Sequence, residues 1–382
     1  ALSYFVQVCR GVLGKPSFRA DFDTLFERGI DPVGVDSYES STEWPAVGEV
    51  FEYRDRVRAE LLDAIEPVAG RGRIFEVAVE HELMHQETLQ YIFQQLPFDF
   101  KKKPEEMPPY RIDGAAEQGR VDVTGGTAVL GADFAEIPFG WDNEFPEHAV
   151  EVGDFAIDRT PVRNAEYLEF VLEGGYLRPE LWRDEDWLWR ERIGLEHPVF
   201  WVRTDGGFLY RTLFDDLELE RVGDWPVFVS HAEAEAFCRW RGGRLATEAE
   251  IHRAAYGTPD GGVRSFPWGD DQPGPKHGNF DFRHWAPTPV GCFPQGESAW
   301  GVSDLVGNGW EWTASVFAPF PGFDAYITSY PGYSADFFDG LHCVLVGASW
   351  ATPSGLIRRS FRNWFQRHYP YQFAKFRVVA NT

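Results

Sequence analysis

The chain has 382 residues, which exceeds a usual single domain and predicts two domains, each with its own core. Its formal charge of −24 would repel phosphate backbones and argues against a nucleic acid partner. The scattered cysteines, the lack of a membrane-length apolar run and the lack of a signal-peptide pattern predict a cytoplasmic protein without a membrane partner.

Helical periodicity dominates the first 100 residues. Residues 1–13 place apolar side chains on one face, and a short helix follows at 21–28. A third helix is expected over 45–65, with Ser41 or Thr42 as its cap. Its predicted buried stripe consists of Val50, Val57, Leu61, Leu62 and Ile65.

The longest helical pattern is EHELMHQETLQYIFQQL, from Glu80 to Leu96, which the apolar segment 74–79 precedes. We expect its apolar stripe to pack against partner helices. That stripe comprises Phe75, Val77, Val79, Leu89, Ile92, Phe93 and Leu96. With short connections between the helices, an antiparallel helical bundle over 1–100 is the natural fold.

His81 and His85 lie four residues apart on this helix, so both imidazoles share one face and can reach one metal ion. The same letters read as HExxH, the zinc peptidase signature, with Glu82 as general base. Thr88 and Tyr91 occupy the positions where a metzincin has Gly and His. Glu87 could orient an imidazole or simply be a solvated helix residue.

Residues 101–120 are rich in Lys, Pro and Glu and are predicted to be a linker. The remaining 121–382 contains short β-like pieces at 119–125, 126–132, 148–158 and 341–350. It also has two clear helical patterns, at 164–172 and at 230–240 with Ser230 as the cap. The pattern predicts a mixed α+β domain with many irregular loops.

The string HELMHQE resembles the end of the DinB-like helical domain of the ergothioneine-type non-haem iron sulfoxide synthases. The later half resembles formylglycine-generating-enzyme-like domains through the ordered motifs PVRNAEYLEFV, GGRLATEAEIHRAA, FPWGD, GESAWGVSDLVGNGWEWT, VLVGASWAT and SFRNWFQRHYPYQFAKFRVV. The resemblance implies an α+β chain with a DinB-like bundle at 1–100 and a C-type-lectin-like, formylglycine-generating-enzyme-like domain at 121–382. The glycines and tryptophans of GNGWEW and GASW are expected to serve as core turns and packing residues.

In that family three histidines hold Fe(II). By resemblance, His81 and His85 match the second and third, and the first is expected immediately before Ala1. The segment 356–377, where formylglycine-generating enzymes carry copper-binding cysteines, has no Cys, so copper chemistry is not expected. A structural Ca(II) in the later domain is a further expectation.

The resemblance also implies residues for substrate and proton transfer. Tyr330 or Tyr38 is expected to act beside the metal, with Tyr333 near the substrate. Asn363 and Trp364 resemble residues that line a histidine-betaine pocket, where an aromatic face attracts a quaternary ammonium. Met84 is also expected at the substrate, where it replaces a Gln that would bond the substrate imidazole in mycobacterial-type enzymes, and Phe365 replaces an Asp of those enzymes.

The implied reaction joins a small thiol, such as cysteine, or a selenium donor to the imidazole of hercynine or histidine with O2, and gives a sulfoxide. No Arg occurs between Arg28 and Arg54, where mycobacterial-type enzymes hold a γ-glutamyl group, and this favours a small thiol. The alternatives are an ovothiol-type histidine and cysteine sulfoxide synthase, a selenoneine synthase, a non-catalytic lectin-like scaffold and an HExxH zinc peptidase.

Overall fold

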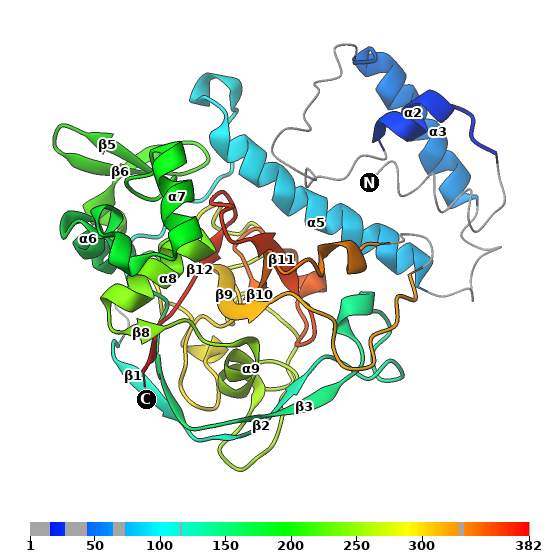
Figure 1. The fold of residues 1–382 in the computed structure, drawn as a ribbon. Coiled ribbons are helices and arrows are strands. Elements are labelled where there is room, and N and C mark those ends of the chain that lie inside the picture. The colour runs from blue at the N-terminus through cyan, green and yellow to red at the C-terminus, as the bar shows by residue number, and fades with distance from the viewer. Residues whose placement is uncertain (1–15, 27–43, 64–72, 115–116, 328–331, 382) are drawn as a thin grey trace. The chain divides into compact units, whose positions relative to one another are not determined.

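The structure, a computed structural model, describes residues 16–26, 44–63, 73–114, 117–327 and 332–381 (Figure 1). Contacts divide the chain into two compact units, Ala1–His85 with Ala325–Tyr333, and Gln86–Asp324 with Ser334–Thr382. The boundary falls inside one continuous helix, α5 (Ile74–Gln95).

In the first unit, α2 (Ala20–Phe26) packs against α3 (Val47–Leu62). The Tyr53 ring contacts the Phe22 ring at 5.2 Å, and its hydroxyl donates a 2.6 Å hydrogen bond to Asp23 Oδ1. These helices confirm the periodic segments predicted near 21–28 and 45–65. The helix expected over 1–13 lies outside the described residues, and the helical bundle stays a prediction.

The predicted details of α3 need two corrections. Its cap residue is Ala46, whose backbone N–H donates to Glu49 Oε2 at 3.2 Å; the predicted caps Ser41 and Thr42 lie outside the described residues. Val57 and Leu61 are buried as expected, but Leu62 is 68% exposed because it lies one residue, about 100°, around the helix from Leu61.

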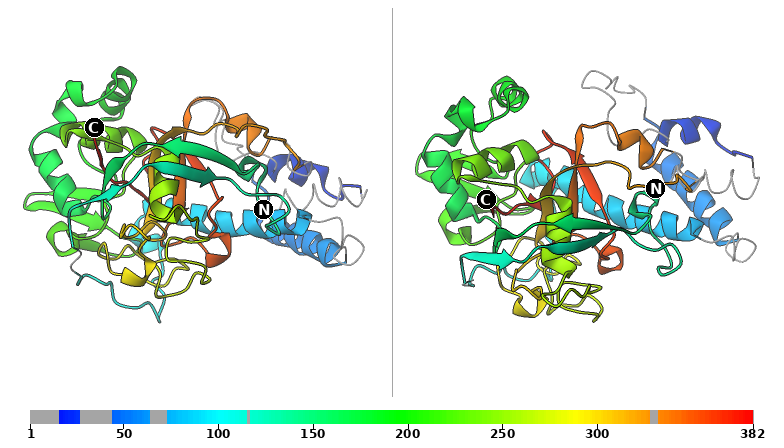
Figure 2. Two further views of the ribbon diagram at one scale, coloured as in Figure 1. Left: turned by 90° about the horizontal axis from the view of Figure 1, so that it is seen from below. Right: turned by 60° about the horizontal axis from the view of Figure 1, so that its bottom comes forward.

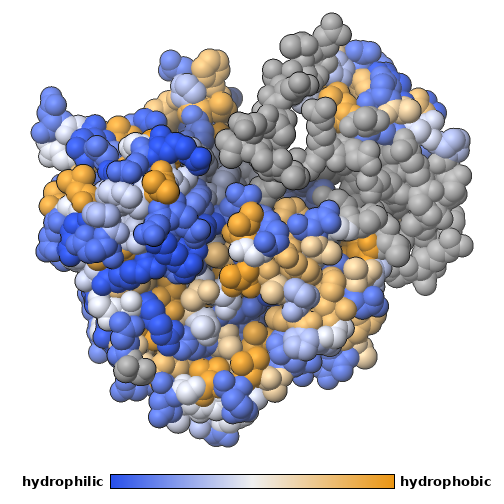
Figure 3. Space-filling view, viewed as in Figure 1, coloured by the Kyte–Doolittle hydropathy of each residue, from blue (hydrophilic) through white to orange (hydrophobic). Residues whose placement is uncertain are grey.

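The predicted packing face of α5 is confirmed at Val77, which is buried, but is wrong for most of the helix. Leu89 is 50% exposed and Ile92 57% exposed, and Val79, Phe93 and Leu96 are exposed as well. The buried face of the second half instead carries Glu87, Tyr91 and Gln94, at the i, i+4 and i+7 positions. Figure 3 shows hydrophobic surface over the turn that follows α5. Hydrophobic pattern alone therefore misassigned the face, because polar side chains with fixed hydrogen-bond partners occupy the buried side.

The second unit is a mixed α+β domain built on two four-stranded sheets (Figure 2). The first has the order β1 (Arg120–Val123), β4 (Phe155–Asp158), β13 (Val379–Ala380) and β8 (Gly243–Arg244). The second has the order β11 (Asn363–Gln366), β10 (His342–Ala348), β9 (Gly309–Val316) and β12 (Ala374–Lys375). Two smaller sheets pair β2 (Gly126–Leu130) with β3 (His148–Val152), and β5 (Trp201–Thr204), β6 (Gly207–Arg211) and β7 (Asp216–Glu218).

The helices of this unit are α6 (Asn164–Leu172), α7 (Asp184–Ile193), α8 (His231–Trp240) and α9 (Glu248–Tyr256). Short 3-10 helices cover Phe98–Phe100, Asp142–Glu144, Gly175–Leu177, Pro179–Leu181, Leu219–Val222, Pro294–Gly296, Ala335–Phe337 and Ser354–Leu356. Helix α9 contacts β2, β3, β9 and β10, and so it joins the two-stranded β2–β3 sheet to the second four-stranded sheet. None of the described helices combines the length and apolar character needed to cross a membrane; the cytoplasmic location stays a prediction.

Several predicted elements of the second unit are confirmed. The helix at 164–172 is α6, and the one at 230–240 is α8, where Ser230 Oγ accepts a 3.3 Å hydrogen bond from Glu233 N. The four β-like pieces contain β1, β2, β3 with β4, and β10. Helices α7 and α9 and strands β5 to β7 were not predicted.

Tryptophans of the glycine-rich motifs pack in the core as expected, since Trp310, Trp312 and Trp350 are all buried. Beside them Glu311 forms ion pairs with Lys375 (3.1 Å) and Arg377 (3.0 Å), and all three side chains are fully buried. Burial of Glu311 raises its pKa, but the two cations outweigh this and lower the pKa overall. The three buried charges of Glu311, Lys375 and Arg377 are thus paired with one another.

The segment predicted as a linker has no helix or strand between 101 and 114. It is nevertheless held against the second unit: Tyr110 OH donates to Asp215 Oδ2 at 2.8 Å, and Trp225 Nε1 donates to the Arg111 carbonyl at 2.8 Å. The domain boundaries at 100 and 120 stay predictions.

Candidate active site

The histidine pair lies on α5, as the spacing predicts. His81 is 8% exposed and His85 is half-buried, and their Nε2 atoms lie 3.1 Å apart with the rings at right angles. Burial lowers the pKa of His81 to about 2 and that of His85 to about 4. Both imidazoles are therefore neutral at neutral pH, which is the form that binds a metal ion.

The distance between the rings fits shared metal ligation. Two nitrogens that each lie about 2.1 Å from one ion, at right angles to each other, would be about 3.0 Å apart. The observed Nε2–Nε2 distance of 3.1 Å matches this arrangement and also suits a hydrogen bond between the two rings. Among the residues that the structure describes, no group of three or more His, Cys, Asp or Glu could hold a metal ion. The third iron ligand and the calcium ion stay predictions.

Met84 lies between the two histidines in sequence and contacts a tyrosine of the predicted site. The Tyr333 hydroxyl donates to the Met84 thioether sulfur at 3.5 Å, and Tyr333 is buried. The structure thus brings Tyr333 to the helix of the histidine pair, within the first unit. Tyr330 and Tyr38 lie outside the described residues.

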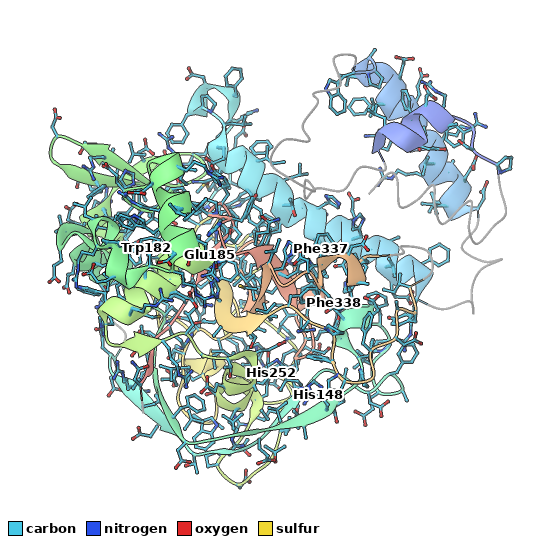
Figure 4. All side chains as sticks on the ribbon, viewed as in Figure 1. His148, Trp182, Glu185, His252, Phe337 and Phe338 are labelled. Carbon is cyan, nitrogen blue, oxygen red and sulfur yellow. The ribbon has the colours of Figure 1, made fainter. Side chains whose placement is uncertain are left out.

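Asn363 and Trp364 lie on β11, in the second unit, where they pair with Leu345 and Val344 of β10. The Trp364 ring stacks on Phe317 at 4.2 Å and contacts Phe337 at 5.6 Å. Figure 4 labels Phe337 together with its neighbour Phe338. Asn363 Oδ1 accepts a 2.9 Å hydrogen bond from Trp364 N. The Trp364 indole is thus part of an aromatic cluster, and its role toward a betaine stays a prediction.

Glu87 fits neither role expected from the sequence, because it is only 4% exposed and none of its partners is a histidine. Its Oε1 accepts from Trp310 Nε1 at 2.8 Å and from Ser349 Oγ at 2.6 Å. Tyr91 OH also donates to Oε1 at 2.8 Å, and Thr352 Oγ1 donates to Oε2 at 2.6 Å. Burial raises the pKa of Glu87, while these hydrogen bonds act in the opposite direction.

The partners of Glu87 were missed by sequence reasoning. Trp310 and Ser349 belong to the motifs GNGWEW and GASW, which were interpreted only as turns and packing residues, and Thr352 follows GASW by two residues. A polar signal was present in the Ser and Thr that flank the buried Trp350, since buried hydroxyls need hydrogen-bond partners. Nothing in the sequence indicated that a carboxylate on α5 would be the acceptor.

Comparisons with known proteins agree with these motifs. Residues 110–382 match the family model described as sulfatase-modifying factor enzyme 1-like domain. The chain is 40% identical to the hercynine oxygenase of Mycolicibacterium smegmatis over 328 residues, which span 82% of this chain and 73% of that protein. It is 38% identical to the hercynine oxygenase of Mycobacterium tuberculosis, over 84% of this chain and 74% of that protein.

A fungal relative extends the match over nearly the whole chain. Ergothioneine biosynthesis protein 1 of Neurospora crassa is 30% identical over 98% of this chain, which spans 52% of that protein. The relatives match beyond the 110–382 domain, and so include the segment with the histidine helix. On this evidence the chain belongs to the ergothioneine sulfoxide synthase family.

Proposed function

We propose that this protein is a non-haem Fe(II) enzyme that uses O2 to join a small thiol, or a selenium donor, to the imidazole of hercynine or histidine. The observation that carries the proposal is the pair His81 and His85, neutral and with Nε2 atoms 3.1 Å apart on one helix. The names of the relatives, hercynine oxygenase and ergothioneine biosynthesis protein, support an oxidative reaction in ergothioneine biosynthesis.

The proposed reaction balances with one O2. A thiol and an imidazole each lose one hydrogen as the C–S bond forms, one oxygen atom becomes the sulfoxide oxygen, and the other leaves as water. When bound, Fe(II) would supply a centre at which O2 is reduced. His81 and His85 would hold the metal, and their neutral state at neutral pH leaves both Nε2 atoms able to bind it.

The remaining site residues have proposed roles that follow from their chemistry. A tyrosine, Tyr330 or Tyr38, would supply a proton beside the metal. Tyr333 is held by its contact with the Met84 sulfur and would line the substrate site. Asn363 and Trp364 would bind the imidazole substrate, with the indole attracting its trimethylammonium group. A substrate without this group, such as histidine, would lose that contribution.

The deciding experiment is an anaerobic titration of the full-length protein with Fe(II), followed by measurement of oxygen uptake. Hercynine with cysteine, histidine with cysteine, and hercynine with a selenium donor would be compared. Uptake that requires iron and both organic substrates is the expected result, and the active pair identifies the substrates. Uptake with histidine and cysteine would identify the ovothiol-type alternative, and uptake with hercynine and a selenium donor would identify the selenoneine synthase. Absence of iron binding would favour the lectin-like scaffold.

We predict that His85→Ala abolishes iron binding and product formation without unfolding the protein, because it removes one of the two ligands on α5. The matched control is Gln86→Ala, which changes the next residue on the exposed side of the same helix. Full turnover in His85→Ala would overturn the proposal. Peptide hydrolysis that is lost in Glu82→Gln would instead support the zinc peptidase alternative.

A further inference from the structure

The buried side of the second half of α5 is polar, so hydrogen bonds attach this part of the helix to the rest of the second unit. Glu87 is the centre of that side, with donors from β9, from the turn after β10 and from α5 itself. Gln94 adds a 2.6 Å hydrogen bond from its Nε2 to the Arg211 carbonyl. The donors to Glu87 thus come from chain segments 223 to 265 residues away, apart from Tyr91.

Apolar packing contributes less to the orientation of this half of α5 than its sequence suggests. Leu89 and Ile92 are 50% and 57% exposed, while Tyr91 packs edge-on against Phe373 at 4.9 Å. Hydrophobic contacts are non-directional, whereas a carboxylate with several fixed donors restricts both rotation and sliding of the helix. The hydrogen bonds of Glu87 therefore provide a directional restraint on α5, to which the hydrogen bond of Gln94 adds.

Glu87 and the histidine pair lie on the same continuous helix, α5. With about 100° of rotation per residue, Glu87 faces about 160° away from His85 and about 120° away from His81. None of the hydrogen-bond donors to Glu87 is a histidine, so an effect of Glu87 on the two imidazoles passes through the helix and not through direct contact. Any rotation of α5 would turn both imidazoles by the same angle.

We propose that Glu87 is a positioning residue, whose carboxylate, together with Trp310, Ser349 and Thr352, restrains the second half of α5 and, through the continuous helix, the backbone that carries His81 and His85. The catalytic meaning of this restraint rests on the proposed function, but the restraint itself is a property of the metal-free protein. It can therefore be tested without iron, substrate or activity.

The test compares four variants of the full chain. Glu87→Ala removes every hydrogen bond of the carboxylate, and Ser349→Ala removes one donor from a distant segment. Glu87→Gln is the conservative variant, because its carbonyl oxygen can still accept from the donors to Oε1. Gln86→Ala is the matched control on the exposed side of α5.

Hydrogen exchange measures the restraint on the helix. Amides of α5 should exchange about tenfold faster in Ser349→Ala and faster still in Glu87→Ala, as expected for the loss of one or several hydrogen bonds from a local structure. Glu87→Gln should restore most of the protection, and Gln86→Ala should leave exchange unchanged. Exchange in α5 of Glu87→Ala that equals the control would overturn the proposal.

Imidazole nitrogen signals in 15N-histidine-labelled, metal-free protein measure the consequence for the pair. The signals of His81 and His85 should shift or broaden in Glu87→Ala, while those of His231 and His252, buried elsewhere in the second unit, stay in place. Faster exchange of α5 with unchanged His81 and His85 signals would also overturn the proposal, because the residue would then be merely structural. If the parent protein fails to bind Fe(II), the proposed function fails, and these two measurements still decide the role of Glu87.

Discussion

Some buried charges in the second unit are paired with a single counter-ion, and this makes the residues of such a pair costly to remove. Arg362 and Glu248 form such a pair, with Nε 2.8 Å from Oε1 and side chains only 2% and 6% exposed. Arg362 also donates to the carbonyls of Asn143 and Ala318, so it joins α9 to the 3-10 helix Asp142–Glu144 and to the loop after β9. Removing the guanidinium would leave the Glu248 carboxylate buried without its cation.

We predict that Arg362→Met lowers the free energy of unfolding by about 3 kcal/mol or more, because an uncompensated buried charge is strongly destabilising. Urea denaturation measures the change. The control is Arg203→Met, since Arg203 lies 3.4 Å from Glu196 with both side chains more than half exposed, and exposed pairs contribute about 0.5 kcal/mol. Adding Glu248→Leu to Arg362→Met should recover part of the loss. Equal losses in the two arginine variants would contradict the prediction.

At the scale of the element, α8 and α9 begin in the same way. Ser230 and Thr247 each accept a hydrogen bond from the backbone N–H three residues later, and the glutamate at that position accepts from the cap residue's own N–H. This reciprocal pair satisfies two donors that a helix start would otherwise leave open. Both caps therefore fix where a short helix enters the core.

We predict that Thr247→Ala destabilises the second unit by about 1 kcal/mol, the usual cost of losing a side-chain cap. Thr247→Ser should retain most of the stability, because its hydroxyl can still accept from Glu250 N. Thermal or urea unfolding of the two variants checks this. The same loss in both would show that the methyl group of Thr247, and not its hydroxyl, is what matters.

These two helices also show how far local sequence predicts the fold. The start of α8 was predicted from Ser230, whereas α9 was missed although Thr247 and Glu250 carry the same S/T-x-x-E signal. The β-like pieces of the second unit were found because alternation and glycine turns are local patterns. The apolar face of α5 was misassigned because its buried side depends on contacts far along the chain.

The residues of the candidate site also differ in whether local sequence predicts them. His81 and His85 were predictable, since four residues of helix place them on one face whatever the rest of the chain does. The role of Glu87 was not, because its partners Trp310 and Thr352 are 223 and 265 residues away. Only the fold brings these donors to one carboxylate.

For the whole molecule, the free energy of unfolding depends on pH through buried groups whose pKa differs between the folded and unfolded states. Burial lowers the pKa of both His231 and His252 to about 4, and His252, labelled in Figure 4, contacts the Val129 carbonyl through Nδ1 at 3.1 Å. Burial raises the pKa of Asp186, but hydrogen bonds from His368 and Arg367 outweigh it and lower the pKa to about 2. Asp186 therefore contributes stability that is present above about pH 4 and is lost only as pH falls through about 2.

The buried histidines affect the stability of the fold in a different pH range from Asp186. An unfolded histidine takes up a proton near pH 6.5, whereas folded His252 stays neutral down to about pH 4, so the unfolded state binds more protons between these limits. His252 therefore favours the folded state above pH 6.5, and this contribution is lost as pH falls toward 4. The expected loss is about 1.4 kcal/mol per pH unit for this one group.

We predict that His252→Gln removes this pH dependence, since an amide can still donate to the Val129 carbonyl but takes up no proton. Urea unfolding of parent and variant at intervals from pH 7 to pH 4.5 gives the difference between their free energies of unfolding. This difference should shift in favour of the variant by about 2 to 3 kcal/mol across the range. Using the difference cancels the contribution of buried carboxylates such as Glu233, whose pKa burial raises. A difference that stays constant with pH would contradict the prediction, because the pKa of His252 would then be the same in the folded and unfolded states.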